Sequence, residues 1–467
     1  MKRRFTVIAV SIAAAVALLP IGSASRAASK GNGQLLTWAG HTWRTFPAAT
    51  SSLGLTADNL CRQGGGAWVR SRYTSPTNIG MYMWSTLAAQ DMGLMGSGEA
   101  NSRLTATLST LAGMERSHGF FYNWYDPATA QRITTWPVNG DAVRPFLSTV
   151  DNGWLAAALI MVRAAKPALA ARVKPILEGM NFGFFYDAYD PQDPYVHPGQ
   201  MYGGYWTDTN EYTNFHYGTL NTEPRIASYI GIAMGDIPRD HYYRMFRTLP
   251  VEYDWQEQIP QGEWHTYWGV PVYEGHYTYN GKRLVPTWGG SMFEALMVPL
   301  VVPEERWAPD SWGVTHPLYV ESQIEHGGVD NALGLWGFSP SNKPEGGYRE
   351  YGVDAIGMNP DGYFSDNVVT PHASFLALRY APRAATSNLQ ALADRFGAFG
   401  RYGFYDSVRV STGEVSDCVL ALDQGMIMAA IANAVSGDDM RRYFSKGAVE
   451  QVVRPLIAPE RFTAGRN

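Results

Sequence analysis

The sequence predicts an all-α protein, an (α/α)6 toroid of six helical hairpins with long aromatic-rich loops and short β-hairpins. Three observations predict this fold class: helical periodicity recurs along the chain, the helices fall into pairs, and a glycine-aromatic motif repeats. An open α-solenoid is the alternative, but its repeats would be more regular than these. The first helix of each pair is expected to line the inner ring.

Apolar residues at helical spacing predict twelve helices, near residues 79–92, 99–118, 148–165, 169–181, 222–234, 239–248, 290–300, 315–331, 371–381, 387–399, 419–436 and 440–456. Most of the six pairs begin roughly 70 residues apart. The motif occurs as Gly119-Phe120-Phe121-Tyr122, as Gly183-Phe184-Phe185-Tyr186 and as Gly403-Phe404-Tyr405. Each of these glycines is expected to end an outer helix, where a left-handed residue is common.

Three long connections are rich in Gly, Pro, Trp and Tyr, namely residues 182–220, 249–289 and 332–370. Loops of this length in a compact domain are functional or disordered, and their aromatic content argues against disorder. We therefore expect them to form the walls of a cleft, with a β-hairpin around residues 267–285.

The first residues are typical of an export signal. Lys2, Arg3 and Arg4 precede an apolar run, and small residues follow around positions 24–28. We expect residues 1–28 to be a signal peptide and residues 29–467 to form a single secreted, extracellular catalytic domain. An uncleaved membrane anchor is the alternative, although the segment is short for a spanning helix. After cleavage no membrane association is expected, because no later segment is apolar enough.

The composition favours a neutral, hydroxyl-rich ligand. Charged residues make up 17% of the chain, aromatic residues make up 13%, and the net charge is −5. This balance provides no basic surface for nucleic acid or for anionic lipid. An oligosaccharide or polysaccharide is the expected partner, because sugars are bound by ring stacking and hydrogen bonds.

The chain has two cysteines, Cys61 and Cys418, which in an exported protein can form one disulfide. Closure of the ring would bring the first and last hairpins, and with them these cysteines, together. Two isolated cysteines do not make a zinc site. No cofactor is expected, and a monomer is predicted. Calcium is a minor alternative, because several loop carboxylates cluster without a known motif: Asp187, Asp190, Asp193, Asp208 and Glu211.

Carboxylates recur where the predicted inner helices begin. Glu223 lies in Asn221-Thr222-Glu223-Pro224-Arg225, with Thr222 or Asn221 as a helix cap and Pro224 in the first turn. Asp151 opens the second inner helix, one turn before Trp154, whose ring would offer a stacking face. The alternative for each carboxylate is a residue that only stabilises the helix dipole.

Two further openings extend this pattern. Asp423, followed by Gln424, lies in an apolar run in the first turn of the last inner helix, and Glu294 follows Trp288. A buried, structurally bonded aspartate is the alternative for Asp423. Together these carboxylates favour glycoside hydrolysis, which needs an acid and a base or nucleophile. His216 and Tyr217 precede Glu223 and are expected to line its pocket, although a loop histidine is often simply solvated.

At these residues the chain resembles the glucoamylase-like family, which includes endo-β-1,2-glucanases and the glucoamylase-like part of cyclic β-1,2-glucan synthases. The resemblance spans roughly residues 75 to 436 and is carried by Gly119 to Asp126, Ser148 to Leu155, Thr222 to Ser228 with Gly235 to Pro238, Trp288 to Glu294, Leu335 to Ser339 with Gly347-Tyr348 and Tyr351-Gly352, and Tyr402 to Asp406 with Leu422 to Gly425. The chain departs from the family's pattern at Pro224 before the Arg, at Ser339-Pro340-Ser341, and in the loops over residues 182–220 and 249–287, which determine the sugar that fits.

The resemblance implies an (α/α)6 toroid and an inverting hydrolase in which Glu223 is the acid and Asp423 the base. The base would act on water directly or through a substrate hydroxyl. The residues expected to bind substrate are Asp151, Trp154, His216, Tyr217, Arg225, Trp288, Glu294, Trp336, Tyr348 and Gln424. Two alternatives remain: a polysaccharide lyase on the same toroid, and a non-catalytic glycan-binding envelope protein.

Overall fold

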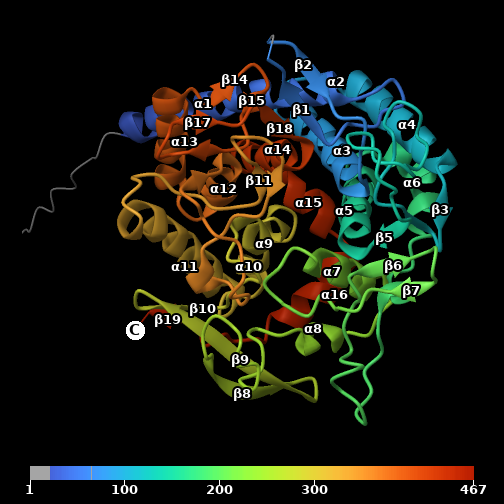
Figure 1. The fold of residues 1–467 in the computed structure, drawn as a ribbon, viewed down its shortest axis with the longest axis vertical. Coiled ribbons are helices and arrows are strands. Elements are labelled where there is room, and N and C mark those ends of the chain that lie inside the picture. The colour runs from blue at the N-terminus through green and yellow to red at the C-terminus, as the bar shows by residue number, and fades with distance from the viewer. Residues whose placement is uncertain (1–20, 65, 467) are drawn as a thin grey trace, which may run out of the picture.

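The computed structural model describes residues 21–64 and 66–466, beginning with helix α1 (Ile21–Trp43) (Figure 1). Residues 1–20 of the predicted signal peptide lie outside the described residues, and the predicted cleavage region, residues 24–28, falls within α1. Among the described residues, 43% are helical and 17% are in strands or isolated bridges. The protein is therefore mostly helical, with more sheet than the all-α prediction allowed.

Six helices contact one another in the order α7, α5, α3, α14, α12, α9 (Figure 1). They are the predicted inner helices, and each begins within three residues of its predicted start. Their bounds are α3 (Pro76–Asp91), α5 (Thr149–Ala165), α7 (Arg225–Met234), α9 (Met292–Leu296), α12 (Pro371–Leu376) and α14 (Ala421–Val435). The arrangement brings their N-terminal ends, and the residues that open them, to one end of the molecule.

Glycines allow the backbones of the inner helices to approach closely. A Cβ atom on Gly80 of α3 would lie 2.9 Å from the Trp154 carbonyl oxygen of α5, and one on Gly425 of α14 would lie 2.7 Å from Met81 Cβ of α3. The indole nitrogen of Trp84 donates to the Gly425 carbonyl oxygen at 2.9 Å. Interiors packed this tightly leave little room for the helix starts to shift.

Each inner helix has an outer partner: α4 packs on α3, α6 on α5, α16 on α7, α11 on α9, α13 on α12, and α1 on α14. The bounds of the outer helices are α4 (Ser97–Gly113), α6 (Ala170–Leu177), α11 (Trp312–Glu325), α13 (Pro382–Phe396) and α16 (Ala448–Ile457). Shorter helices are α2 (Thr45–Ala49), α8 (His241–Arg244), α10 (Glu304–Trp307) and α15 (Asp439–Ser445).

The last predicted outer helix, residues 440–456, is wrong as a single element. It is split into α15 and α16 by Gly447, which has a φ of 99°. The place beside α14 is taken instead by α1, whose Trp38 packs edge-on against Phe375 and Phe404 at centroid distances of 5.7 and 5.5 Å. The chain thus closes its outer layer with an N-terminal helix that periodicity did not assign.

The predicted helix over residues 239–248 shortens to α8, because the chain after it pairs with the segment that leads to α7. The amide of Phe246 donates to the Gly218 carbonyl oxygen at 2.6 Å, and the Leu220 amide donates to the Phe246 carbonyl oxygen at 2.9 Å. These two bonds hold the turn that carries Glu223.

The largest sheet has four strands in the order β19-β10-β9-β8, and it confirms the hairpin predicted around residues 267–285. The other sheets of the described part have two or three strands. The strands are β1 (Asn59–Arg62), β2 (Trp68–Arg70), β3 (Arg116–Ser117), β4 (Phe120–Phe121), β5 (Phe146–Ser148), β6 (Gly204–Trp206), β7 (Glu211–Tyr212), β8 (Gln261–Tyr267), β9 (Val270–Tyr279), β10 (Lys282–Leu284), β11 (Ser341–Asn342), β12 (Tyr348–Arg349), β13 (Val368–Val369), β14 (Phe399–Gly400), β15 (Gly403–Phe404), β16 (Val408–Arg409), β17 (Glu414–Val415), β18 (Cys418–Leu420) and β19 (Gly465–Arg466).

The predicted disulfide is confirmed. Cys61 of β1 and Cys418 of β18 are bonded, and they face each other in an antiparallel ladder. The bond joins the segment before α3 to the segment that leads directly into α14.

The repeated glycines form tight turns and do not end helices, so this part of the prediction is wrong. Gly119 (φ 85°) connects β3 to β4, Gly403 (φ 96°) begins β15 at its turn from β14, and Gly183 lies in a short 3-10 turn. Left-handed glycines do end helices elsewhere, for example Gly235 after α7 and Gly397 after α13.

A cavity of about 680 Å³ lies at the C-terminal ends of α9, α12 and α14, where Leu296, Phe375 and Asn433 are among its lining residues. None of the residues that we predicted for the site lines it. The predicted site lies at the opposite, N-terminal ends of these helices.

Across the described residues, no single helix is long and apolar enough to cross a bilayer. Helix α5 and the following segment Pro167–Phe185 meet the length and composition requirement only as a pair bent by 119°.

Candidate active site

The N-terminal ends of the six inner helices place polar side chains at one end of the ring. These side chains are Thr77 and Asn78 on α3, Asp151 on α5, Glu223 immediately before α7, Glu294 on α9, His372 on α12 and Asp423 on α14. The four carboxylates at helix openings were predicted from the sequence. The polar residues of α3 and α12 were not.

Glu223 lies in a turn that leads into α7 and is half-buried. The predicted side-chain cap is wrong, because Thr222 Oγ1 donates to the Thr219 carbonyl oxygen and Asn221 Nδ2 donates to the Val285 carbonyl oxygen. Burial, followed by the negative charge of Glu294, raises the pKa of Glu223 to about 8. The carboxyl is thus protonated at neutral pH while part of the residue stays accessible to solvent.

Asp151 is the second accessible carboxylate, and it is fixed by two neighbours. Thr77 Oγ1 of α3 donates to its Oδ1 at 2.6 Å, and its amide donates to the capping hydroxyl of Ser148 at 3.2 Å. Asp151 is half-buried, and its charge contributes to the raised pKa values of Glu223 and Tyr217. Asp151, Glu223 and the Tyr217 hydroxyl therefore lie close together.

Asp423 occupies the third position of α14 and is 1% exposed, which differs from the predicted cleft-facing carboxylate. His372 Nδ1 lies 3.1 Å from Asp423 Oδ2. Burial raises the pKa of Asp423, and the neighbouring imidazole opposes this rise. In the free protein Asp423 is closed to solvent because it lies deeper in the ring than Glu223.

Asp58, which sequence reasoning missed, is a third half-buried carboxylate at this end. Asn78 Nδ2 of α3 donates to its Oδ1 at 2.8 Å, and its carbonyl oxygen accepts the Ala421 amide of α14 at 2.8 Å. Burial raises the pKa of Asp58 to about 6, and the charges of Asp423 and Asp151 add to this rise. Asp58 thus bridges the starts of α3 and α14, next to the disulfide-linked strands.

Glu294 does not offer its carboxylate to a ligand, contrary to prediction. It is 4% exposed and completes a capping box with Ser291, while it also accepts from Thr287 Oγ1 and the Gly289 amide. Its contribution to the site is indirect, because its negative charge raises the pKa of Glu223.

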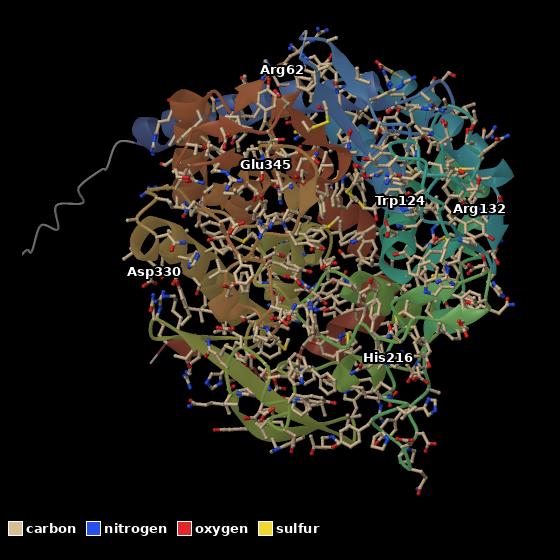
Figure 2. All side chains as sticks on the ribbon, viewed as in Figure 1. Arg62, Trp124, Arg132, His216, Asp330 and Glu345 are labelled. Atoms are coloured by element: carbon tan, nitrogen blue, oxygen red, sulfur yellow. A yellow bond between two sulfur atoms is a disulfide. The ribbon has the colours of Figure 1, made fainter. Side chains whose placement is uncertain are left out.

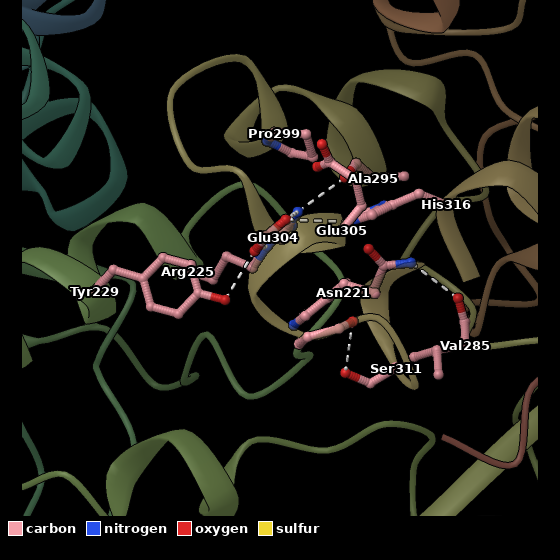
Figure 3. A network of polar contacts seen from close by, with 12 residues as sticks. Asn221, Arg225, Tyr229, Val285, Ala295, Pro299, Glu304, Glu305, Ser311 and His316 are labelled. Carbon is pink, nitrogen blue, oxygen red and sulfur yellow. Dashed lines mark hydrogen bonds and ion pairs between the residues drawn. The ribbon is translucent and has the colours of Figure 1, made fainter. Parts of the chain in front are cut away.

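Arg225 is likewise buried in the wall of the ring and does not face a ligand (Figure 3). Its guanidinium binds Glu304 through two hydrogen bonds of 2.9 and 3.0 Å, and it donates to the Glu294 and Ala295 carbonyl oxygens. It also lies 4.8 Å from the ring of Trp312. Arg225 therefore links α7 to α9 and closes the ring. Because it is buried, it does not offer the contact with sugar that we predicted.

Three more predicted binding residues are buried. Trp154 is 1% exposed and packs edge-on against Trp84, Trp336 is 5% exposed, and Gln424 is 1% exposed and donates to the Phe404 carbonyl oxygen at 2.9 Å. These side chains hold the ring together and leave no surface on which a sugar could stack.

Aromatic side chains remain accessible around Glu223. Tyr348 of β12 is 52% exposed, while Trp288 and Tyr217 are half-buried. The charges of Asp423 and Glu223 both raise the pKa of Tyr348, so its hydroxyl lies close to both carboxylates. Tyr363, which was not predicted, is also close to Glu223. The loops over residues 182–220, 249–289 and 332–370 thus bring aromatic side chains to the site, as predicted.

His216 lies after β7 on the loop beside the site (Figure 2). Its Nε2 is 2.8 Å from Asp187 Oδ2, and His197 Nδ1 is 2.8 Å from Asp187 Oδ1. His216 also stacks on Tyr202 at a centroid distance of 4.4 Å. It supports the loop, and the structure gives it no contact with Glu223.

The loop carboxylates considered for calcium are engaged elsewhere or dispersed. Both oxygens of Asp187 face histidines, and Asp208 pairs with Arg144 at 2.9 Å. In the part of the chain that the structure describes, no three His, Cys, Asp or Glu side chains are arranged to hold a metal ion.

The arrangement combines a protonated, accessible glutamic acid with two accessible aspartates and one buried aspartate. The neutral acid can donate a proton, and an ionised aspartate can accept one. The surrounding tyrosines and Trp288 provide apolar faces and hydroxyl groups of the kind that bind a sugar.

Comparisons with known proteins identify two family models and one curated relative that match parts of the chain. Residues 255–444 match the family model named Glycoamylase, and residues 37–190 match a family model of unknown function, DUF3131. The chain is 24% identical over 556 residues to the cyclic β-(1,2)-glucan synthase NdvB of Rhizobium meliloti (strain 1021). The match covers 89% of this chain but only 18% of NdvB.

Two solved structures share the fold. The endo-β-1,2-glucanase of Chitinophaga pinensis, in complex with sophorotriose and glucose, matches with a TM-score of 0.66 and 16% identity over 91% of this chain and 98% of that one. A variant of the endo-β-1,2-glucanase of Talaromyces funiculosus, in complex with β-1,2-glucan, matches with a TM-score of 0.66 and 15% identity, over 94% of this chain and 95% of that one. The resemblance to the glucoamylase-like family that the sequence indicated is therefore confirmed, through the Glycoamylase model, the homology to NdvB and the fold shared with endo-β-1,2-glucanases.

Proposed function

We propose that this protein is a secreted glycoside hydrolase on an (α/α)6 toroid, which cleaves β-1,2-glucan or a related glycan with inversion of configuration. One observation carries the proposal: Glu223 is a partly accessible carboxyl at a helix N-terminus whose pKa is nevertheless raised to about 8. A helix N-terminus alone would lower that pKa. The surroundings therefore keep the carboxyl neutral, as a general acid requires.

In this proposal Glu223 donates its proton to the oxygen of the glycosidic bond as that bond breaks. With a pKa of about 8, the Glu223 carboxyl is mostly protonated at pH 7. Water attacks the anomeric carbon from the opposite face and loses a proton, which a base accepts.

Asp423 is the proposed base, acting through a substrate hydroxyl. Its oxygens are closed to solvent, so water does not reach them in the free protein. A sugar hydroxyl that contacts Asp423 would pass on the proton lost by water. Tyr348 lies close to both carboxylates and is the side chain that would shift to open this path.

The structure favours hydrolysis over the two alternatives. A polysaccharide lyase needs a cation near a uronic acid, and the cation that we had assigned to the substrate, Arg225, is buried against Glu304. A non-catalytic relative would keep its carboxylates buried and paired, whereas Glu223, Asp151 and Asp58 are all half-buried.

The comparisons support the substrate class. Two proteins that share the fold are endo-β-1,2-glucanases bound to β-1,2-linked ligands, and the homologous NdvB is a cyclic β-(1,2)-glucan synthase. The disulfide supports export, because such bonds persist in oxidising compartments.

The test is release of reducing ends from a panel of glucans of defined linkage, with purified wild-type protein and Glu223→Gln. We expect release from β-1,2-glucan by the wild type and loss of at least about a thousandfold in Glu223→Gln, with a Tm that is not lower than that of the wild type. Proton NMR of the first product would show the inverted anomer. Equal activity of both proteins, or release of an unsaturated product that absorbs in the ultraviolet, would overturn the proposal.

A further inference from the structure

His372 is the second residue of α12 and lies beside the proposed base. It is 1% exposed, and its Nδ1 is 3.1 Å from Oδ2 of Asp423, on the neighbouring helix α14. Among the described residues, neither ring nitrogen and neither carboxylate oxygen has a hydrogen-bond partner, so the approach of Nδ1 to Oδ2 is a close polar contact and not an aligned hydrogen bond. The two side chains are therefore each other's only polar partner.

The contact is closed to solvent, because both side chains are buried. A carboxylate that is buried away from water is costly unless a partner offsets its charge, and His372 is the side chain that contacts Asp423.

The groups that face Asp423 from other elements do not replace this contact. Asp58, immediately before β1, and Asp406, between β15 and β16, are carboxyl groups whose pKa values are raised by the Asp423 charge. Tyr348 of β12 faces Asp423 with its phenol, whose pKa is raised by burial and by the Asp423 charge. His372 is the neighbour that opposes the rise in the pKa of Asp423.

We propose that His372 is a positioning residue for hydrolysis, whose imidazole, in contact with the buried Asp423 carboxylate, keeps that carboxylate ionised and fixed for proton transfer. The inference rests on the proposed function. In the reaction, a bond forms between the water oxygen and the anomeric carbon while the glycosidic bond breaks. Glu223 protonates the leaving oxygen, and the proton lost by water reaches Asp423 through a sugar hydroxyl.

Two variants of His372 separate this role from simple packing. His372→Asn retains an N–H group near the position of Nδ1, whereas His372→Leu fills the space without a donor. For His372→Leu we expect the acidic limb of the pH profile of kcat/KM on β-1,2-glucan to shift to higher pH by at least one unit. At a given pH on that limb, kcat/KM then falls about tenfold. The limb of His372→Asn should stay near that of wild type. An equal loss in both variants without movement of the limb would overturn the inference.

A second measurement needs no activity. Because the pKa of Asp423 is raised in the folded protein, ionisation of Asp423 destabilises the fold, and stability is lost as the pH rises through that pKa. Without the donor this loss should grow, so the Tm of His372→Leu should fall further below that of His372→Asn between pH 5 and pH 8. In an Asp423→Asn background this difference should vanish.

The two measurements distinguish the inference from the function on which it rests. If the effects of the His372 and Asp423 substitutions on Tm are coupled but the wild type does not hydrolyse β-1,2-glucan, the proposed function is refuted. The interaction between His372 and Asp423 is then still supported. Hydrolysis by wild type without coupling between His372 and Asp423 would refute the inference alone.

Discussion

Removal of the Cys61–Cys418 disulfide should destabilise the protein without inactivating it. The bond closes a loop with a sequence separation of 357 residues, and the chain-entropy relation gives a loss of about 6 kcal/mol at 25 °C. This is an upper value, because a compact unfolded ensemble already restricts the chain. For a chain of this length a loss of this size corresponds to a fall in Tm of about 6 °C.

The assay is urea unfolding of the double variant Cys61→Ser, Cys418→Ser against wild type, with reduced wild type as the matched control. Activity at 25 °C should persist, because β1 and β18 remain paired and the Ala421 amide still donates to the Asp58 carbonyl oxygen. A change in unfolding free energy below about 1 kcal/mol would refute the reasoning. Loss of activity in a protein of unchanged stability would refute it as well.

Three further predictions concern the site. Above about pH 8, kcat/KM of the wild type should fall about tenfold per pH unit as Glu223 ionises, and a profile that stays flat to pH 9 would contradict this. Because ionisation of Glu223 destabilises the folded protein, Glu223→Gln should gain stability relative to wild type between pH 5 and pH 8. Asp58→Asn should lower kcat at least about tenfold, whereas Asp417→Asn, which changes an exposed carboxylate beside the same sheet, should leave kcat unchanged. Equal effects on kcat would remove Asp58 from the site. Arg225→Met should cost about 3–5 kcal/mol of unfolding free energy because Glu304 is left buried without its partner, and a cost below about 1 kcal/mol would contradict the assigned structural role.

The inner helices could be predicted from the sequence because their apolar periodicity and first-turn residues are local signals. Ser148 before α5 and Ser291 before α9 cap their helices through their side chains, and both helices begin within two residues of the predicted starts. The outer layer depends on contacts between distant segments, which a local pattern does not reveal. Helix α1 takes the place beside α14 because Trp38 finds its aromatic partners near the other end of the chain.

The site was predicted in part, because a position at a helix opening does not determine how deep a side chain lies. Asp151 and Glu294 both occupy the third position of their helices. Asp151 stays half-buried, whereas Glu294 folds back into a capping box. Trp154, three residues after Asp151, lies one turn deeper and meets Trp84 of the neighbouring helix.

Asp58 and His372 were missed for different reasons. Asp58 comes from a segment ahead of the ring, and the only sequence signal was its place three residues before a predicted disulfide cysteine. His372 follows Pro371 at the start of the fifth predicted inner helix, an opening that carries no carboxylate, whereas the predicted site was built from carboxylates. Its signal is its position in the first turn, which it shares with Asp151 and Asp423.

Dependence on the leaving group tests the role of Glu223 most directly. When a dinitrophenyl glycoside of a β-1,2-linked glucose oligosaccharide is cleaved, the dinitrophenolate group leaves without protonation. A sugar leaving group needs a proton from the acid. We expect Glu223→Gln to hydrolyse the aryl glycoside at a rate near that of wild type and to lose at least about a thousandfold on β-1,2-glucan. Equal losses on both substrates, or no loss on the glucan, would contradict the assignment of Glu223 as the acid.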